Sequence, residues 1–307
     1  MVKIDFLTLA DFKRDELDAM LEAAVVAKRA WRAGSAELQL RGRVLGLVFH
    51  KPSLRTRLSF EVGMRQLGGS SLYITDAEIG FGKREAIQDI GGVMSRYLDG
   101  IMIRTFAQED VVALARAASI PIVNGLTDAV HPCQVLCDLF TIREQGRPLD
   151  GLRLAYLGDG NNVANSWIDA ARLYEIDLRI AAPEGHDPDP AALARIRRDG
   201  RGRVRVTRDA HEAVEGAQVV YTDTWTSMGQ EAEAAERRRV FPPYQVNAAL
   251  LRGAAPDALV MHCLPAHRGE EITDEVIDGP QSIVYAQAGN RLHGQKGILL
   301  HCLGARR

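Results

Sequence analysis

Five consecutive residues in the first half of the chain have the chemistry of an anion site. Ser53-Leu54-Arg55-Thr56-Arg57 follows an apolar run and opens a predicted helix. The free backbone N–H groups of a helix start, two hydroxyls and two guanidinium groups can together bind a phosphate. An ordinary helix N-cap with exposed arginines is the alternative interpretation of the same residues.

A second polar group opens the helix predicted at 133–146. In His131-Pro132-Cys133-Gln134, the side chains of the histidine and the glutamine could reach one polarised carbonyl and one amide. A histidine at such a place can equally be structural. Arg104 ends a predicted strand, at the edge of the sheet where ligands of α/β proteins collect, although taken alone it proves little.

The second half carries its own candidates at strand ends and helix starts. Asp223 could pair with a cationic amine or simply cap its loop, and Asn165 can present an amide one turn into a helix. Cys263 could be a reactive thiolate, but a buried cysteine is the commoner case. The loop at Gly158 lacks the third glycine of the dinucleotide-binding fingerprint, so it indicates nucleotide binding only weakly.

Strand and helix patterns alternate along both halves, which predicts an α/β fold with two doubly wound parallel-sheet domains. We expect domains at 1–147 and 148–289, with a last helix within 290–307 packed on the first. Strands are expected at 44–49, 71–74, 100–104, 120–124, 152–157, 178–181, 204–206, 218–222, 259–264 and 282–286. Helices are expected at 12–33, 54–67, 84–97, 108–118, 133–146, 163–174, 191–199 and 291–303, and a solvated helix or mobile loop at 230–239.

The composition is that of a globular protein, with 46% hydrophobic and 25% charged residues among 307. A net charge of -2 gives no field that would favour nucleic acid or a membrane surface. Four cysteines without Cys-x-x-Cys spacing indicate a reducing compartment. The charged segment 1–18 does not read as a signal peptide, so we expect a cytoplasmic protein.

Taken in order, the motifs of the whole chain resemble the ornithine carbamoyltransferase family. The motifs around Ser53 and His131 are shared by the wider transcarbamoylase superfamily, whereas those that begin at Asp223 and His262 mark the ornithine branch. The motifs are Phe49-x-Lys51-x-Ser53-x-Arg55-Thr56-Arg57, Gly82-Lys83-Arg84-Glu85, His131-Pro132-x-Gln134, Gly158-Asp159-x-Asn161-Asn162, Asp223-x-x-x-Ser227-Met228-Gly229, His262-Cys263-Leu264-Pro265 and Asn290-Arg291-x-His293.

The resemblance implies an enzyme that transfers the carbamoyl group of carbamoyl phosphate to the side-chain amine of L-ornithine, giving citrulline and phosphate. It implies an active site in the cleft between the two domains and no metal or organic cofactor. It also implies a homotrimer, or a multiple of trimers, in which the loop around Lys83 reaches a neighbouring subunit.

Residue by residue, the motifs assign two sets of binding positions and four catalytic residues. The carbamoyl phosphate set is Ser53, Leu54, Arg55, Thr56, Arg57, Gly80, Arg104, His131, Pro132, Cys133, Gln134 and Arg291. The ornithine set is Asn165, Asp223, Ser227, Met228, Cys263 and Leu264. The residues expected to act in catalysis are Arg104, His131, Asp223 and Cys263.

The chain departs from the family pattern at three positions. Leu54 replaces a usual threonine, Gly80 falls where a glutamine contacts carbamoyl phosphate from the adjacent subunit, and Gly289 replaces a frequent glutamate. Three other functions stay open at this point. The first is a sister transferase that uses another amine, such as putrescine, an acylated ornithine or aspartate. The second is a nucleotide-dependent oxidoreductase built on the Gly158 loop. The third is a binding protein that has lost activity.

Overall fold

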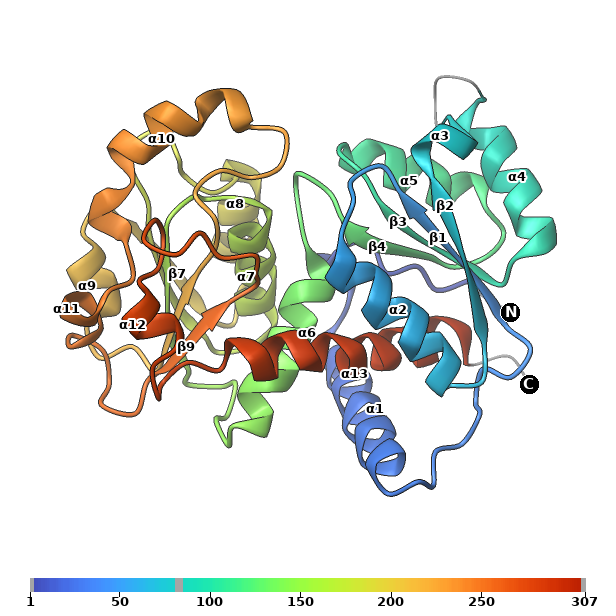
Figure 1. Cartoon of the computed structure of the whole chain (residues 1–307), viewed down its shortest axis with the longest axis horizontal. Helices are drawn as coiled ribbons and strands as arrows, with labels where there is room; N and C mark the ends of the chain where they lie inside the picture. Colours follow the sequence, from blue (N-terminus) through green and yellow to red (C-terminus); the bar gives the residue numbers. More distant parts are fainter. Residues whose placement is uncertain (1–2, 81–84, 305–307) are drawn as a thin grey trace. The chain divides into compact units, whose positions relative to one another are not determined.

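The computed structural model describes residues 3–80 and 85–304. The chain divides into two compact units (Figure 1). Unit 1 comprises Met1–Phe140 and Gly289–Arg307, and unit 2 comprises Thr141–Ala288. The long helices α6 (Pro132–Glu144) and α13 (Val284–Leu303) each contribute residues to both units.

In the described part of unit 1, four parallel strands form a sheet in the order β2-β1-β3-β4. Helices α2 and α13 lie on one side of this sheet and α4 and α5 on the other (Figure 1). The strands are β1 (Val44–Phe49), β2 (Ser70–Thr75), β3 (Gly100–Arg104) and β4 (Ile122–Leu126). The helices are η1 (Leu9–Asp11), α1 (Arg14–Arg32), α2 (Leu54–Gln66), α3 (Asp76–Ile79), α4 (Ile87–Tyr97) and α5 (Gln108–Ala117).

The sheet of unit 2 has five parallel strands in the order β7-β6-β5-β8-β9. Figure 1 shows α7 and α8 on one side of it and α9, α11 and α12 on the other. The strands are β5 (Arg153–Leu157), β6 (Asp177–Ala181), β7 (Arg203–Thr207), β8 (Val219–Thr222) and β9 (Leu259–His262). The helices are α7 (Asn162–Leu173), α8 (Pro190–Asp199), α9 (Ala210–Val214), η2 (Glu231–Glu233), α10 (Ala234–Val240), η3 (Pro242–Tyr244), α11 (Ala248–Leu251) and α12 (Asp274–Ile277).

The strand register brings the candidate residues of each unit to one sheet edge. In unit 1, Phe49 at the end of β1 pairs with Arg104 at the end of β3. In unit 2, Leu157, Thr222 and His262 are paired across β5, β8 and β9. Because the strands are parallel, the loops that follow them emerge at the same edge, where α/β proteins bind ligands.

The parallel-sheet fold is confirmed, and β1 and β3 have the predicted bounds. The strand predicted at 282–286 is wrong: Ser282 makes only an isolated bridge to Val260, and α13 begins at Val284 rather than at Arg291. The β-branched and aromatic residues of this segment favour a strand locally, but it continues into a helix. Across residues 3–80 and 85–304, no helix combines the length and apolarity that a membrane span requires.

Two further segments differ in part from the sequence-based expectation. The stretch 230–239 contains η2 and nearly all of α10, so the helix alternative is confirmed and the loop alternative is not. Most residues of this helical stretch are exposed, but Arg237 is buried, with an exposed fraction of 4%. Strand β9 ends at His262, so that Cys263 and Leu264 lie in the loop that follows.

Candidate active site

The arginine-containing segment of unit 1 forms a capped helix start. Ser53 Oγ accepts a hydrogen bond from Thr56 N at 3.3 Å and lies 3.1 Å from Thr56 Oγ1. Arg55 is half-buried in the first turn of α2. The cap leaves other N–H groups of this turn to face an anion, and the guanidinium adds positive charge beside them.

Arg291, from α13, is bound into the same group. Its Nη2 donates to Thr56 Oγ1 at 3.2 Å and its Nη1 donates to Gln134 Oε1 at 2.6 Å. Gln134 in turn donates through Nε2 to Asp138 Oδ1 at 2.8 Å. Residues far apart in the sequence, in α2, α6 and α13, are thus joined by a buried hydrogen-bonded network.

His131 is 5% exposed and sits among positive charges. Burial lowers its pKa well below the usual value of 6.5, and the charges of Arg291, Arg104 and Arg55 lower this pKa further. The imidazole is therefore neutral at neutral pH. Three guanidinium groups and an uncharged imidazole form a site that favours an anion and can still hydrogen-bond a neutral carbonyl.

The two residues after His131 lie at the start of α6. Pro132 is the first residue of α6, and the Cys133 thiol lies 3.2 Å from the carbonyl oxygen of Asn124. Burial raises the pKa of Cys133 to about 12, so this sulfur stays protonated and is a poor nucleophile.

Three further predicted carbamoyl phosphate positions have the following surroundings. Arg57 pairs with Glu61 at 3.4 Å and its guanidinium lies 4.0 Å from the centre of the Tyr73 ring. Leu54 is 71% exposed. Gly80 follows α3 with φ 56°, a left-handed conformation that resists a side chain. Residues 82–84 of the second motif lie outside the described residues.

In unit 2, the Asp223 carboxylate is the centre of the candidate site. Its Oδ1 accepts from Cys263 Sγ at 2.8 Å and from Thr224 N at 2.8 Å. Its Oδ2 accepts from Asn161 Nδ2 at 2.8 Å. A carboxylate that accepts from three donors is held in one orientation, and its negative charge can attract a cationic amine.

His262 and the loop after it are held by a second buried network. His262 Nδ1 accepts from Leu264 N at 2.9 Å, so the proton of the neutral ring is on Nε2, which lies 3.0 Å from Glu271 Oε1. Leu264 has φ 57°, which is strained for a leucine. Strain of this kind is typical of functional loops.

The other predicted ornithine residues also lie in unit 2. Asn165 is 7% exposed, and its Oδ1 accepts from Asp189 N at 2.9 Å. Ser227 is half-buried and Met228 is 44% exposed in the loop after β8. Sequence reasoning missed Asn161 and Arg237 as contacts of the site. Only Asn161 carried a signal, as part of the motif at Gly158.

Asp223, His262 and Cys263 also offer ligand atoms that lie within 4.8 Å of one another, a donor set that could hold a metal ion. In the described structure these atoms are already engaged in the hydrogen bonds given above. The short distances among these three side chains are thus explained by hydrogen bonds within the protein.

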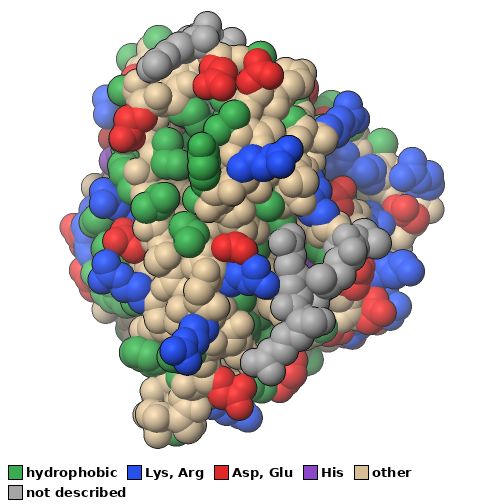
Figure 2. Space-filling view, turned by 90° about the vertical axis from the view of Figure 1, so that its right-hand side faces the viewer, with side chains coloured by type: hydrophobic (Ala, Val, Ile, Leu, Met, Phe, Trp, Pro, Cys, Tyr) green, Lys and Arg blue, Asp and Glu red, His purple; other side chains and the backbone are tan. Residues whose placement is uncertain are grey.

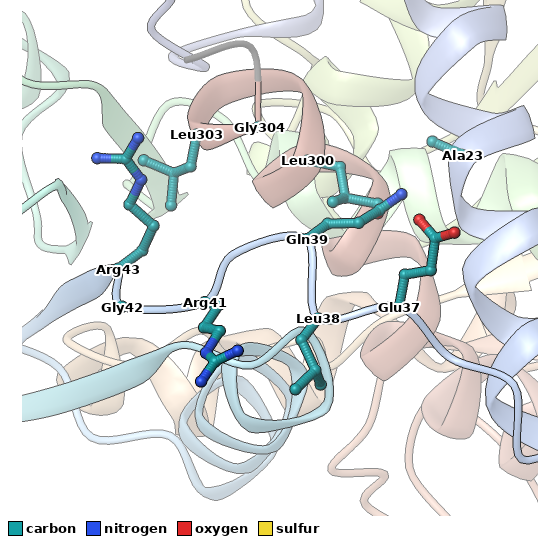
Figure 3. Close-up of a pocket in the computed structure, with 10 residues that line it drawn as sticks. All are labelled: Ala23, Glu37, Leu38, Gln39, Arg41, Gly42, Arg43, Leu300, Leu303 and Gly304. Atoms are coloured by element: carbon teal, nitrogen blue, oxygen red, sulfur yellow. The ribbon is translucent and has the colours of Figure 1, made fainter. Parts of the chain in front are cut away.

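A separate pocket of about 770 Å³ lies in unit 1, between the loop 37–43 and the end of α13 (Figure 3). Arg41 and Arg43 line it together with Leu300 and Leu303. Among the described residues, its lining includes none of the predicted site positions. We therefore do not assign the substrate site to this pocket.

One parallel α/β unit with an arginine-rich anion site and another with a carboxylate suited to an amine define a group-transfer enzyme. Residues 4–144 match the family described as aspartate/ornithine carbamoyltransferase, carbamoyl-P binding domain, and residues 150–302 match its Asp/Orn binding domain. The chain belongs to the aspartate/ornithine carbamoyltransferase family, which confirms the resemblance seen in its motifs.

Curated relatives and solved structures agree with this assignment. The chain is 55% identical to an ornithine carbamoyltransferase of Symbiobacterium thermophilum over 299 residues, covering 96% of each chain. It is 51% identical to that of Syntrophus aciditrophicus, covering 97% of this chain and 99% of the relative. The ornithine carbamoyltransferase structure from Pyrococcus furiosus matches with a TM-score of 0.94 and 45% identity over 100% of both chains.

Proposed function

We propose that the protein is an ornithine carbamoyltransferase, which converts carbamoyl phosphate and L-ornithine to citrulline and phosphate. The observation that carries the proposal is 55% identity over almost the whole chain to a relative of that name. The Asp223–Cys263 pair supports ornithine as the acceptor, because a carboxylate can form a charge-assisted hydrogen bond with the amine of a basic amino acid.

The reaction is an acyl transfer in which the side-chain amine attacks the carbamoyl carbon and phosphate leaves. An amine of this type has a pKa near ~10.4, so the site must bind or generate its neutral form. We assign the steering of the amine to Asp223 and Cys263. Arg104, His131 and Thr56 stabilise the oxyanion of the tetrahedral intermediate, and Arg55 and Arg57 compensate the charge of the leaving phosphate.

The neutral state of His131 fits this role. A charged imidazole among Arg55, Arg104 and Arg291 would add repulsion, whereas a neutral ring can accept or donate a hydrogen bond to the carbamoyl group. The remaining predicted contacts, including Gly80 in carbamoyl phosphate binding and Asn165, Ser227, Met228 and Leu264 in ornithine binding, belong to the same proposal.

We further propose a homotrimer. On α2, Leu54, Leu58 and Val62 follow one another at helical spacing and are 71%, 50% and 36% exposed. Leu72 on the neighbouring strand β2 is 54% exposed. Figure 2, which faces unit 1, shows hydrophobic side chains gathered between charged ones. Exposed apolar groups of this kind favour burial against another subunit.

The same reaction can serve arginine metabolism in either direction, toward citrulline or in arginine breakdown. We place the enzyme in arginine biosynthesis, where citrulline is an intermediate. We propose a cytoplasmic location, which the four free cysteines support because a reducing compartment preserves thiols.

The test is the stoichiometric formation of citrulline and phosphate by the purified protein. Ornithine is compared with putrescine, an acylated ornithine and aspartate at equal concentrations. We expect kcat/KM to be highest for ornithine. A higher value for another amine would identify a sister transferase, and the absence of any product from all four amines would refute the proposed activity.

A further inference from the structure

Asn161 accepts hydrogen bonds from three donors through one oxygen. Its Oδ1 caps α7 by accepting from Val163 N at 2.9 Å and from Ala164 N at 3.3 Å. The same oxygen accepts from the Tyr156 hydroxyl at 2.9 Å. With three donors on this side, the amide can face them only with its oxygen, so its orientation is fixed.

Tyr156 is a reliable donor in this arrangement. The side chain is fully buried and its ring stacks on Tyr221 with 5.6 Å between ring centres. Burial raises the pKa of Tyr156 well above 10, and the negative charges of Asp223 and Asp159 act in the same direction. The phenol therefore remains protonated and holds the oxygen side of the Asn161 amide.

The other side of the fixed amide faces Asp223. Asn161 Nδ2 donates to Asp223 Oδ2 at 2.8 Å. The other oxygen, Oδ1, accepts hydrogen bonds from Cys263 Sγ and Thr224 N. Other titratable groups around the carboxylate are Tyr156 and His262. Asn161 thus links the start of α7 to the one carboxylate that we assign to the amine.

We propose that Asn161, oriented by Tyr156, is a positioning residue that holds the Asp223 carboxylate in the orientation in which it receives the amino-acid substrate. This inference rests on the proposed function, in which Asp223 receives the amine. It goes beyond that function because it gives a role to two residues that are not expected to touch either substrate.

Asn161→Asp separates this role from helix capping. Aspartate caps a helix as well as asparagine does, so α7 should keep its start. The substitution replaces the donor to Asp223 by a second carboxylate, and two adjacent carboxylates share protons at a raised pH. We expect kcat/KM for ornithine to fall roughly tenfold to hundredfold, the range expected for loss of a hydrogen bond to a charged group.

Three further readouts, beside the ornithine kinetics, distinguish positioning from a merely structural effect. The acid limb of the pH profile of kcat/KM for ornithine should move to higher pH in Asn161→Asp. Binding of carbamoyl phosphate to the free enzyme, measured by calorimetry, and the melting temperature should stay near the wild-type values. Unchanged ornithine kinetics and an unchanged pH profile would mean that Asn161 only caps the helix, and parallel losses in all four measurements would also overturn the inference.

Tyr156→Phe is the second variant and keeps the stacked ring. It removes only the hydroxyl, so we expect a few-fold loss of kcat/KM for ornithine, the effect of a neutral hydrogen bond, with carbamoyl phosphate binding unchanged. If Asn161→Asp does not fold, this variant decides, and wild-type ornithine kinetics in it would overturn the inference. A wild-type protein that forms no citrulline would refute the proposed function itself, and this inference with it.

Discussion

Burial has opposite consequences for two neighbouring residues of the candidate site. It lowers the pKa of His131, whose charged form is the protonated one, and it raises the pKa of Cys133 to about 12, because the charged form of a thiol is the deprotonated one. Both side chains are thereby kept neutral at neutral pH. The charges at this site are therefore carried by the arginines.

The neutral state of His131 predicts a dependence of stability on pH. In the unfolded chain this histidine binds a proton below pH 6.5, whereas in the folded protein its pKa is well below that value. The free energy of unfolding therefore has the full contribution of His131 above pH 6.5. It declines as the pH falls below this value, by at most about 1.4 kcal/mol per pH unit. Between pH 7.5 and 5.5, the melting temperature of His131→Asn should fall less than that of the wild type. Equal decreases would show that another group dominates.

Arg55→Ala tests the anion site. Removal of one charged hydrogen bond to phosphate should weaken carbamoyl phosphate binding by on the order of 1.5–3 kcal/mol, measured by calorimetry. Arg65→Ala is the matched control on the same helix, since its side chain is 75% exposed. Affinity that is equal in both variants would place the phosphate elsewhere.

At the scale of elements, α10 is tied to the site by one buried charge. Arg237 donates to Asp159 Oδ2 at 2.9 Å and to the carbonyl oxygen of Trp225 at 2.8 Å. It thereby joins α10 to the loops that follow β5 and β8. The adjacent Arg238 pairs with Glu270 at the surface, where its side chain is 62% exposed.

These two arginines give a matched comparison. Arg237→Ala leaves the nearly buried Asp159 without its main counter-ion and should destabilise the protein by ~3 kcal/mol or more in chemical denaturation. It should also raise KM for ornithine, because the loop after Asp223 loses its anchor. Arg238→Ala removes an exposed pair and should cost less than ~1 kcal/mol. Similar losses of stability in both variants would contradict the importance of the buried pair.

At the scale of the whole molecule, the proposed trimer would bury the exposed apolar side chains of α2 in a subunit interface. Leu58→Glu puts a charge in the middle of this row and should shift the protein from trimer to monomer in light scattering. Val26→Glu on α1 is the control, since Val26 is 55% exposed on another helix. A monomeric wild type, or a Leu58→Glu variant that stays trimeric, would exclude this face as the interface.

The sequence by itself determined the parallel α/β fold, the positions of β1 and β3, and the family. These features depend on local periodicity and on residues close together in the chain, which a single sequence displays directly. The motif at Ser53 likewise predicted a helix start, with an N-cap as one interpretation of its residues, and the structure has a capped helix start there.

Only the tertiary structure decided which residues act together. Hydrogen bonds join Arg291 to Thr56 and Gln134, and another joins Asn161 to Asp223. The residues of these pairs are separated by 62 to 235 positions in the chain. No local pattern specifies such pairs, because strand order and register set them. For the same reason the segment 282–286 was mistaken for a strand: its residue types favour a strand, while the long helix α13 that includes its last residues is stabilised by distant packing.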